Sequence, residues 1–84
     1  MNNRNVTIYI SDHDPNCTDL LKQMDAWKIS YQTKNISRQS EQRKELQEME
    51  IYGTPATFIE GEYKAILGFQ KDKLKHALGI PNRL

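Results

Sequence analysis

The side chains with the most evident chemistry lie in one short stretch, residues 12–17, which reads Asp-His-Asp-Pro-Asn-Cys. Asp14 followed by Pro15 predicts the start of a helix, because an Asp side chain caps free N–H groups and Pro suits the first helical position. Cys17 then lies three residues further on, where burial and the negative charge of Asp14 both raise the pKa of a thiol. We expect a slow nucleophile.

Simpler interpretations of these residues exist. Cys17 can be a small core residue, which is the commoner fate of a lone cysteine, and Asp14 can be a helix cap and nothing more. A metal site built from residues 12–14 and Cys17 is disfavoured, because four neighbours in one turn rarely converge on one ion and nothing elsewhere completes the set. We expect no metal and no other cofactor.

The composition limits the class of protein. The chain has 84 residues, enough for a single domain over residues 1–84 with a modest core, and its one cysteine permits no internal disulfide. Twelve Lys and Arg balance eleven Asp and Glu, so no net field favours nucleic acid or a membrane surface. No apolar run approaches the ~18 residues needed to cross a bilayer. We expect a cytoplasmic protein that binds neither nucleic acid nor membrane.

The first half of the chain is typical of a strand, a helix and a second strand. Apolar residues at Val6, Ile8 and Ile10 alternate with Thr and Tyr, as in a strand with one face in the core. A helical apolar stripe follows, and residues 29–34 alternate again. Because a β-α-β unit has a right-handed crossover, the end of the first strand and the start of the helix should meet at one sheet edge. The stripe comprises Cys17, Leu20, Leu21, Met24 and Trp27.

The second half predicts a helix, a hairpin and a last helix. Residues 38–50 contain no Gly or Pro and only Leu46 and Met49 as large apolar residues, which predicts a surface helix with a narrow buried stripe. Residues 56–59 and 64–67 predict two short strands joined by a Gly-containing turn. The last helix should end at a Gly-Ile-Pro sequence. The predicted order is β-α-β-α-β-β-α.

Three local features, in order and at matching spacing, make the chain resemble the glutaredoxin and NrdH-redoxin branch of the thioredoxin superfamily. The first is Asp14-Pro15-Asn16-Cys17, which stands where the family carries Cys-x-x-Cys. The second is Tyr52-Gly53-Thr54-Pro55, which resembles the family's cis-proline loop. The third begins at Gly68-Phe69 and resembles the Ser-Gly-Phe-x-Pro-Asp run of NrdH redoxins more than the Gly-Gly-x-Asp-Asp run by which glutaredoxins hold glutathione.

The resemblance covers about residues 5–80. It implies an α/β thioredoxin fold, with a four-stranded mixed sheet and three helices. Two registers of the cysteine motif stay open: either Cys17 matches the second family cysteine and Asp14 replaces the first, or Cys17 matches the first and Leu20 replaces the second. We favour the former, because it keeps the intervals to the flanking strands without a gap. In that register the chain keeps the second family cysteine, which resolves the mixed disulfide, and lacks the first, which attacks the substrate.

The function that the resemblance implies is thiol-disulfide exchange. We predict a redox protein with a one-cysteine active site made of Cys17 and Asp14, poor at dithiol turnover. The alternative is a catalytically degenerate module that binds an extended peptide at Thr54-Pro55 without turnover.

The resemblance also implies partners and a binding groove. The partners would be a protein thiol or disulfide and a reductant similar to thioredoxin reductase. Because the glutathione-holding run is absent, we expect no glutathione binding. The residues implied to line the groove are Tyr52, Thr54, Pro55, Gly68 and Phe69.

Overall fold

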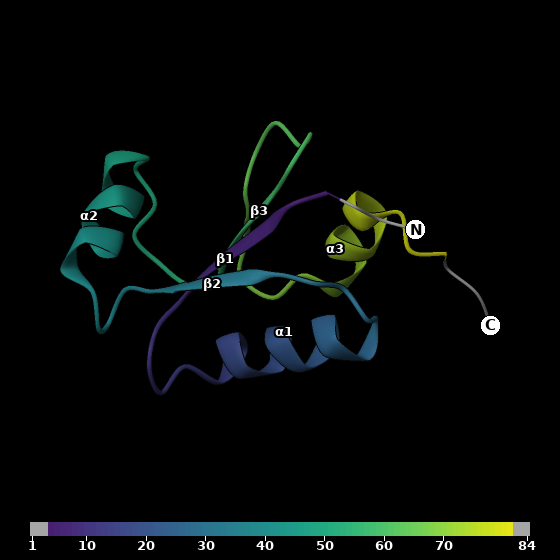
Figure 1. Ribbon diagram of the computed structural model, residues 1–84, viewed down its shortest axis with the longest axis horizontal. Coiled ribbons are helices and arrows are strands. Elements are labelled where there is room, and N and C mark those ends of the chain that lie inside the picture. The colour runs from purple at the N-terminus through teal and green to yellow at the C-terminus, as the bar shows by residue number, and fades with distance from the viewer. Residues whose placement is uncertain (1–3, 82–84) are drawn as a thin grey trace.

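The structure, a computed structural model, describes residues 4–81. Its helices and strands follow the predicted order, β-α-β-α-β-β-α, with a four-stranded sheet and three helices (Figure 1). The elements are β1 (Val6–Ile10), α1 (Pro15–Ala26), β2 (Gln32–Asn35), α2 (Ser40–Glu48), β3 (Ala56–Ile59), β4 (Ile66–Leu67) and α3 (Lys71–Leu78).

The sheet has the strand order β2-β1-β3-β4 and is mixed, as predicted. β1 pairs in parallel with β2 and antiparallel with β3, so Ile8 stands between Thr33 on one side and Thr57 on the other. The hairpin of β3 and β4 is antiparallel. The parallel pair follows from the helical crossover between β1 and β2, which brings the start of α1 to the carboxyl end of β1.

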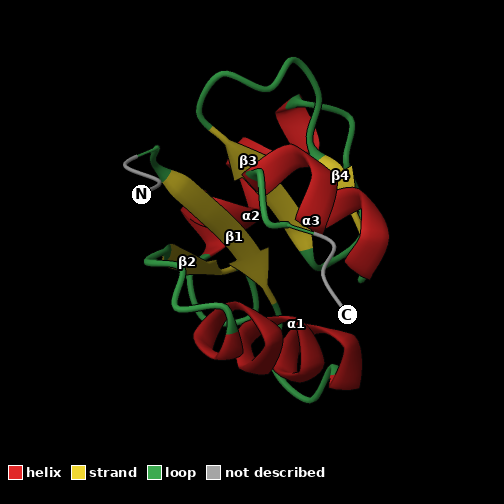
Figure 2. Cartoon of the chain, turned by 90° about the vertical axis from the view of Figure 1, so that its right-hand side faces the viewer, coloured by secondary structure: helices red, strands yellow, loops and turns green. Residues whose placement is uncertain are grey.

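The larger core lies between the sheet and the two helices α1 and α3. Alternation in β1 sends Val6 and Ile8 to this face, where the apolar stripe of α1 meets them. Figure 2 shows α3 in front of the sheet and α2 behind it, with α1 along the lower edge. The buried members of this core are Val6, Ile8, Leu20, Met24, Ile59, Ile66, Leu74 and Leu78.

A smaller core on the opposite face holds α2. Tyr9, Leu46 and Ala56 are buried there. The Tyr9 ring meets the Phe58 ring edge to face, with 5.4 Å between the centroids and 66° between the planes. The two central strands, β1 and β3, therefore contribute side chains to both faces of the sheet, because neighbours along a strand point to opposite sides.

A polar group above this smaller core fastens α2 to the sheet. The Tyr9 hydroxyl donates a hydrogen bond to Glu45, and Lys34 Nζ donates to the same carboxylate at 2.8 Å. Lys34 Nζ also lies 5.3 Å from the centre of the Tyr9 ring. The hydrogen bond from Lys34 lowers the pKa of Glu45, and the one to Glu45 raises the pKa of Lys34. We call Tyr9, Lys34 and Glu45 the α2 cluster.

The ends of α1 and α2 explain where the structure departs from the predicted elements. Lys28, after α1, has φ 61°, and Glu50, after α2, has φ 62°, although neither is glycine. In each case the residue that follows, Ile29 or Ile51, donates its N–H back into the last turn of the helix. This is the Schellman geometry that usually uses glycine.

This geometry moves two predicted boundaries. Ile29 N–H donates to the Met24 carbonyl at 3.0 Å, so Ile29 completes the cap that follows α1, and β2 begins at Gln32, three residues later than predicted. After α2, Ile51 folds back against the smaller core, while Met49 is 42% exposed. The prediction that Met49 extends the buried stripe of α2 is wrong; Ile51 does so instead. β4 is also shorter than predicted, Ile66–Leu67 rather than 64–67.

None of the helices within residues 4–81 has the length and apolar character to cross a membrane.

Candidate active site

The start of α1 lies at the carboxyl end of β1, as the β-α-β reading predicts (Figure 1). Asp14 is the N-cap: its Oδ1 accepts a hydrogen bond from the Asn16 N–H at 3.0 Å, and Pro15 occupies the first helical position. The main-chain carbonyl of Asp14 accepts from the Cys17 N–H, also at 3.0 Å. The helix start predicted from Asp14-Pro15 is therefore confirmed. The second carboxylate oxygen of Asp14, Oδ2, faces the loop before β3 instead of the helix backbone.

Cys17 is the third residue of α1 and turns inward. Its side chain is 3% exposed, and the thiol is free. Burial raises the pKa of Cys17, and the negative charge of Asp14 raises it further. The Ser11 backbone and the Thr54 hydroxyl act in the opposite direction by hydrogen bonding to the sulfur. The net direction is upward, as predicted for a buried thiol beside a carboxylate.

The loop before β3 meets the start of α1 through Thr54. The Thr54–Pro55 peptide bond is cis, and Pro55 is buried. Thr54 Oγ1 donates a hydrogen bond to Asp14 Oδ2 at 3.1 Å and lies 2.6 Å from Ser11 Oγ. Two segments far apart in the sequence, residues 11–17 and the loop before β3, thus converge on one group. We call Ser11, Asp14, Cys17 and Thr54 the Cys17 cluster.

The remaining residues predicted for the groove fall into different positions. Gly68, directly after β4, donates its N–H to the Pro55 carbonyl at 2.8 Å, so it lies beside the cis-proline loop. Phe69 is half-buried and packs against the larger core. Tyr52 is 75% exposed and is not a member of the Cys17 cluster. The structure brings Thr54, Pro55 and Gly68 together and leaves Tyr52 at the periphery.

Ser11 is the member of the cluster that the sequence reading missed. It is the first residue after β1, and its hydroxyl reaches the Thr54 hydroxyl across the gap between two loops. The available signal is its position, because polar residues directly after a strand gather at the edge where the neighbouring loops meet.

A second set of hydrogen bonds braces the loop that carries the site. The Asp12 carboxylate accepts from Asn35 Nδ2 at 3.0 Å and from Arg38 Nε at 3.2 Å, and these two donors lower the pKa of Asp12. The Asp12 N–H donates to Ser37 Oγ at 2.9 Å. The loop between β1 and α1 is thereby joined to the loop between β2 and α2.

The Cys17 cluster contains a negative charge without a cation. Among residues 4–81, no Lys, Arg or His forms an ion pair with Asp14, whereas Asp12 pairs with Arg38. No group of three or more His, Cys, Asp or Glu side chains that could hold a metal ion occurs in that range either. The Cys17 cluster itself consists of one thiol, two hydroxyls and one carboxylate.

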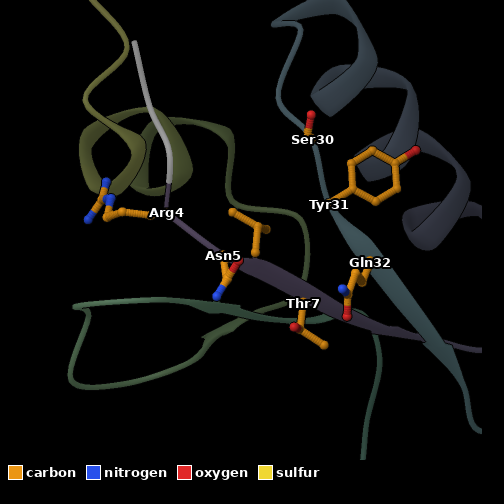
Figure 3. Close-up of a pocket in the computed structure, with 7 residues that line it drawn as sticks. Arg4, Asn5, Thr7, Ser30, Tyr31 and Gln32 are labelled. Carbon is orange, nitrogen blue, oxygen red and sulfur yellow. The ribbon is translucent and has the colours of Figure 1, made fainter.

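A surface hollow of about 460 Å³ lies away from this cluster, at the opposite end of β1. It is open and polar, and Figure 3 shows its side chains spread along two neighbouring strands rather than pointing to one common centre. It shares no residue with the Cys17 cluster, so we do not assign the active site to it. Its lining comes from Arg4, Asn5, Val6, Thr7, Ser30, Tyr31 and Gln32.

Comparison with known proteins points to one family. The family model described as Glutaredoxin matches residues 6–64, which include Asp14, Cys17, Thr54 and Pro55. No curated protein sequence matches the chain.

Solved structures agree on the fold. NrdH-redoxin from Escherichia coli, described as glutaredoxin-like with a thioredoxin-like activity profile, superposes with a TM-score of 0.76 at 18% identity, over 86% of this chain and 92% of its own. A glutaredoxin from Methanosarcina mazei Go1 gives 0.76 at 22% identity, over 89% and 78%. Buckwheat glutaredoxin, solved with glutathione, gives 0.67 at 24% identity, over 93% and 73%. These likenesses confirm the predicted thioredoxin-like fold.

Proposed function

The chain belongs to the glutaredoxin family, and on that premise we propose that it exchanges disulfides slowly through Cys17 alone. The observation that carries the proposal is the position of Cys17, buried one turn into α1 beside the cis Thr54–Pro55 loop, with Asp14 on the helix cap before it. In a Cys-x-x-Cys motif at a helix start, the cap position belongs to the attacking cysteine. The geometry thus supports the register in which Asp14 replaces the first cysteine.

The proposed exchange needs one sulfur here and a disulfide on the partner. The Cys17 thiolate attacks one sulfur of that disulfide, a bond forms between the two sulfurs, and the other partner sulfur leaves as a thiolate. A dithiol reductant, of the kind thioredoxin reductase represents, then attacks the Cys17 sulfur and releases the second partner thiolate. Its other sulfur closes a disulfide within the reductant and frees Cys17. The partner gains two electrons, and the reductant loses them.

Three features of the cluster make this exchange slow. Burial and the charge of Asp14 keep the thiolate fraction low, since both raise the pKa of Cys17. Cys17 is 3% exposed, so a partner disulfide reaches its sulfur only when the start of α1 opens locally. Asp14 occupies the N-cap position, and a carboxylate cannot exchange disulfides. We therefore propose single-cysteine exchange rather than rapid dithiol turnover.

The partner surface that we propose lies around the cis-proline loop. Thr54 is half-buried at the surface of the Cys17 cluster, and Gly68 flanks Pro55 through a hydrogen bond. An extended protein segment can lie along such a loop by strand-like pairing with its backbone. Tyr52, exposed at the start of the loop, is available to contact that segment from one side. Phe69 supports the surface from the core.

A second candidate function is peptide binding without exchange. The observation that favours it is Asp14 itself, which is fixed at both oxygens, by the Asn16 N–H and by Thr54 Oγ1, in the place of a nucleophile. A module of this kind would use the same loop surface and need no reactive thiol. The two candidate functions differ in whether the Cys17 thiol is required.

Trapping the mixed disulfide tests the proposal. The reduced protein is incubated at neutral pH with an extended peptide that carries an activated disulfide, and intact mass is measured over time, with Cys17→Ser as control. We expect a slow adduct of one peptide on the wild type and none on Cys17→Ser. If the wild type forms an adduct only after denaturation, the exchange proposal fails. Peptide binding retained by Cys17→Ser would then favour the binding module.

A further inference from the structure

The Thr54 hydroxyl contacts both of the other oxygen-bearing side chains of the Cys17 cluster. It lies 2.6 Å from Ser11 Oγ and 3.1 Å from Asp14 Oδ2, and its ability to donate a hydrogen bond to the sulfur acts to lower the pKa of Cys17. A hydroxyl carries one proton and two acceptor lone pairs. An ionised carboxylate only accepts, so the Thr54 proton is committed to Asp14, and the Ser11 hydroxyl donates to the Thr54 oxygen.

A thiolate is also an acceptor without a proton. When Cys17 ionises, its sulfur competes with Asp14 Oδ2 for the single Thr54 proton. Asp14 is the charged group that acts on the sulfur, and no Lys, Arg or His within residues 4–81 forms an ion pair with it. The Thr54 proton therefore goes either to the Asp14 carboxylate or to the Cys17 thiolate, with no cation among the described residues paired to Asp14 to change the balance.

We propose that Thr54 is a positioning residue whose hydroxyl switches between Asp14 and Cys17, and that Asp14 holds it away from the sulfur. This inference rests on the proposed function, because it assigns regulation to the same sulfur. With the thiol protonated, Thr54 donates to Asp14 and locks the start of α1 to the loop before β3. With the thiolate formed, Thr54 turns to the sulfur, and Asp14 loses a hydrogen bond. Asp14 thus suppresses reactivity by engaging the donor as well as by its charge.

Asp14→Asn is the substitution that releases the donor. Asn is as good an N-cap as Asp, so its Oδ1 can keep the hydrogen bond from the Asn16 N–H. Its amide nitrogen then faces Thr54 and donates to the Thr54 oxygen, which leaves the Thr54 proton for the sulfur. Thr54→Val removes that proton at nearly constant volume, and Thr54→Ser restores it.

Thr57 offers a matched control for Thr54→Val. It lies two residues after Pro55 on β3, is fully buried, and its hydroxyl has no hydrogen-bond partner among the residues that the structure describes. Thr57→Val makes the same chemical change three residues further along the chain and alters no residue of the Cys17 cluster.

The test is a double-mutant cycle read by NMR. The Cβ chemical shift of Cys17 is followed against pH in the wild type, Asp14→Asn, Thr54→Val and the double variant. We expect Asp14→Asn to lower the pKa of Cys17. Thr54→Val should reduce the thiolate fraction by about twofold in the wild type and by about fivefold or more in Asp14→Asn, with Thr54→Ser close to wild type and Thr57→Val without effect.

Equal effects of Thr54→Val in both backgrounds, or none in either, would overturn the switch. Because this readout needs no disulfide partner, it separates the two proposals. A coupled titration in a protein that forms no mixed disulfide would keep the switch and reject the exchange. An uncoupled titration in a protein that does form one would do the reverse.

Discussion

The two polar clusters, one above the smaller core and one at the edge of the sheet beyond β1, use similar groups in opposite ways. In the α2 cluster, a carboxylate, an ammonium and a phenol contact one another, and the ion pair of Lys34 and Glu45 favours the charged form of each. In the Cys17 cluster, a carboxylate stands beside a second acid, the Cys17 thiol, with two hydroxyls and no ion-pair partner within residues 4–81.

The difference shows what each cluster is suited to. A compensated group such as the α2 cluster holds a helix in place and resists a change of charge, because each ionised side chain already has its partner. The Cys17 cluster resists a second negative charge, because ionisation of Cys17 places a thiolate beside the Asp14 carboxylate. We infer that the first cluster serves stability and the second serves reactivity.

Among substitutions that change the difference between the two clusters, Asp14→Cys should have the largest effect, and the effect is on disulfide reduction. A cysteine at the cap position would gain a lowered pKa from the free N–H groups and recreate Cys-x-x-Cys with Cys17. We expect insulin-disulfide reduction to rise from background in the wild type to about tenfold above it or more. Asp14→Ser is the matched control and should stay at background.

Ellman titration of the oxidised Asp14→Cys variant sharpens the result. We expect both thiols to disappear without a dimer on a non-reducing gel. Two persistently free thiols would contradict the register in which Asp14 replaces the first cysteine, and would favour the register that replaces the second with Leu20. Wild-type turnover equal to that of a dithiol redoxin would contradict the single-cysteine proposal outright.

The next effect is on stability. Asp14→Ala removes an N-cap and the hydrogen bond from Thr54, and should lower the free energy of unfolding by about 0.5 to 2 kcal/mol. Urea denaturation at neutral pH measures this loss. Asp14→Asn keeps the cap and should retain most of the stability. A loss as large in Asp14→Asn as in Asp14→Ala would mean that the charge, and not the cap, carries the contribution.

A smaller effect is expected in the compensated cluster. Glu45→Gln should destabilise less than Asp14→Ala, because both partners of the surface ion pair remain partly solvated. The pKa of Glu45 is lowered from 4.5, so the stability it contributes is present above that value and is lost as pH falls through the folded pKa. Urea midpoints of the two proteins should therefore converge in acid. A gap that widens below pH 4 would contradict this assignment.

The smallest effect expected is that of glutathione. Gly68-Phe69-Gln70 lacks the second glycine and the paired acids by which the family run holds the tripeptide. We expect no chemical-shift change in the Thr54 and Gly68 amides at low-millimolar glutathione, with a disulfide-activated peptide as positive control. Saturable shifts at these two amides would show that the Cys17 cluster takes a small thiol as well as a protein.

Local signals in the sequence are enough to place most of the elements. Alternation in Val6–Ile10 and the cap-proline pair at Asp14 predict β1 and the start of α1 correctly, because each signal acts within a few residues. The start of β2 and the exposure of Met49 are not predictable in this way. Both depend on Lys28 and Glu50 adopting left-handed conformations that sequence rules reserve mainly for glycine.

The residues of the site also separate into those that local sequence predicts and those that depend on tertiary contacts. Cys17, Asp14 and the Thr54-Pro55 loop are recognisable from motif spacing, and the direction of the Cys17 pKa shift follows from burial beside a carboxylate. Ser11 and the shared Thr54 hydroxyl are not recognisable, because they depend on two loops meeting across the sheet edge. Spacing along the chain says nothing about which lone pair faces which proton.

The bridge between the two loops at this edge has a consequence for the timescale on which the site opens. Amides of loops usually exchange with solvent through small independent fluctuations. Here the Asp12 N–H is held by Ser37, and the Ser37 and Arg38 N–H groups are both held by the Asn35 side chain. These three protons should exchange as one cooperative unit, so the frequency with which α1 exposes its first turn is set partly by the loop between β2 and α2.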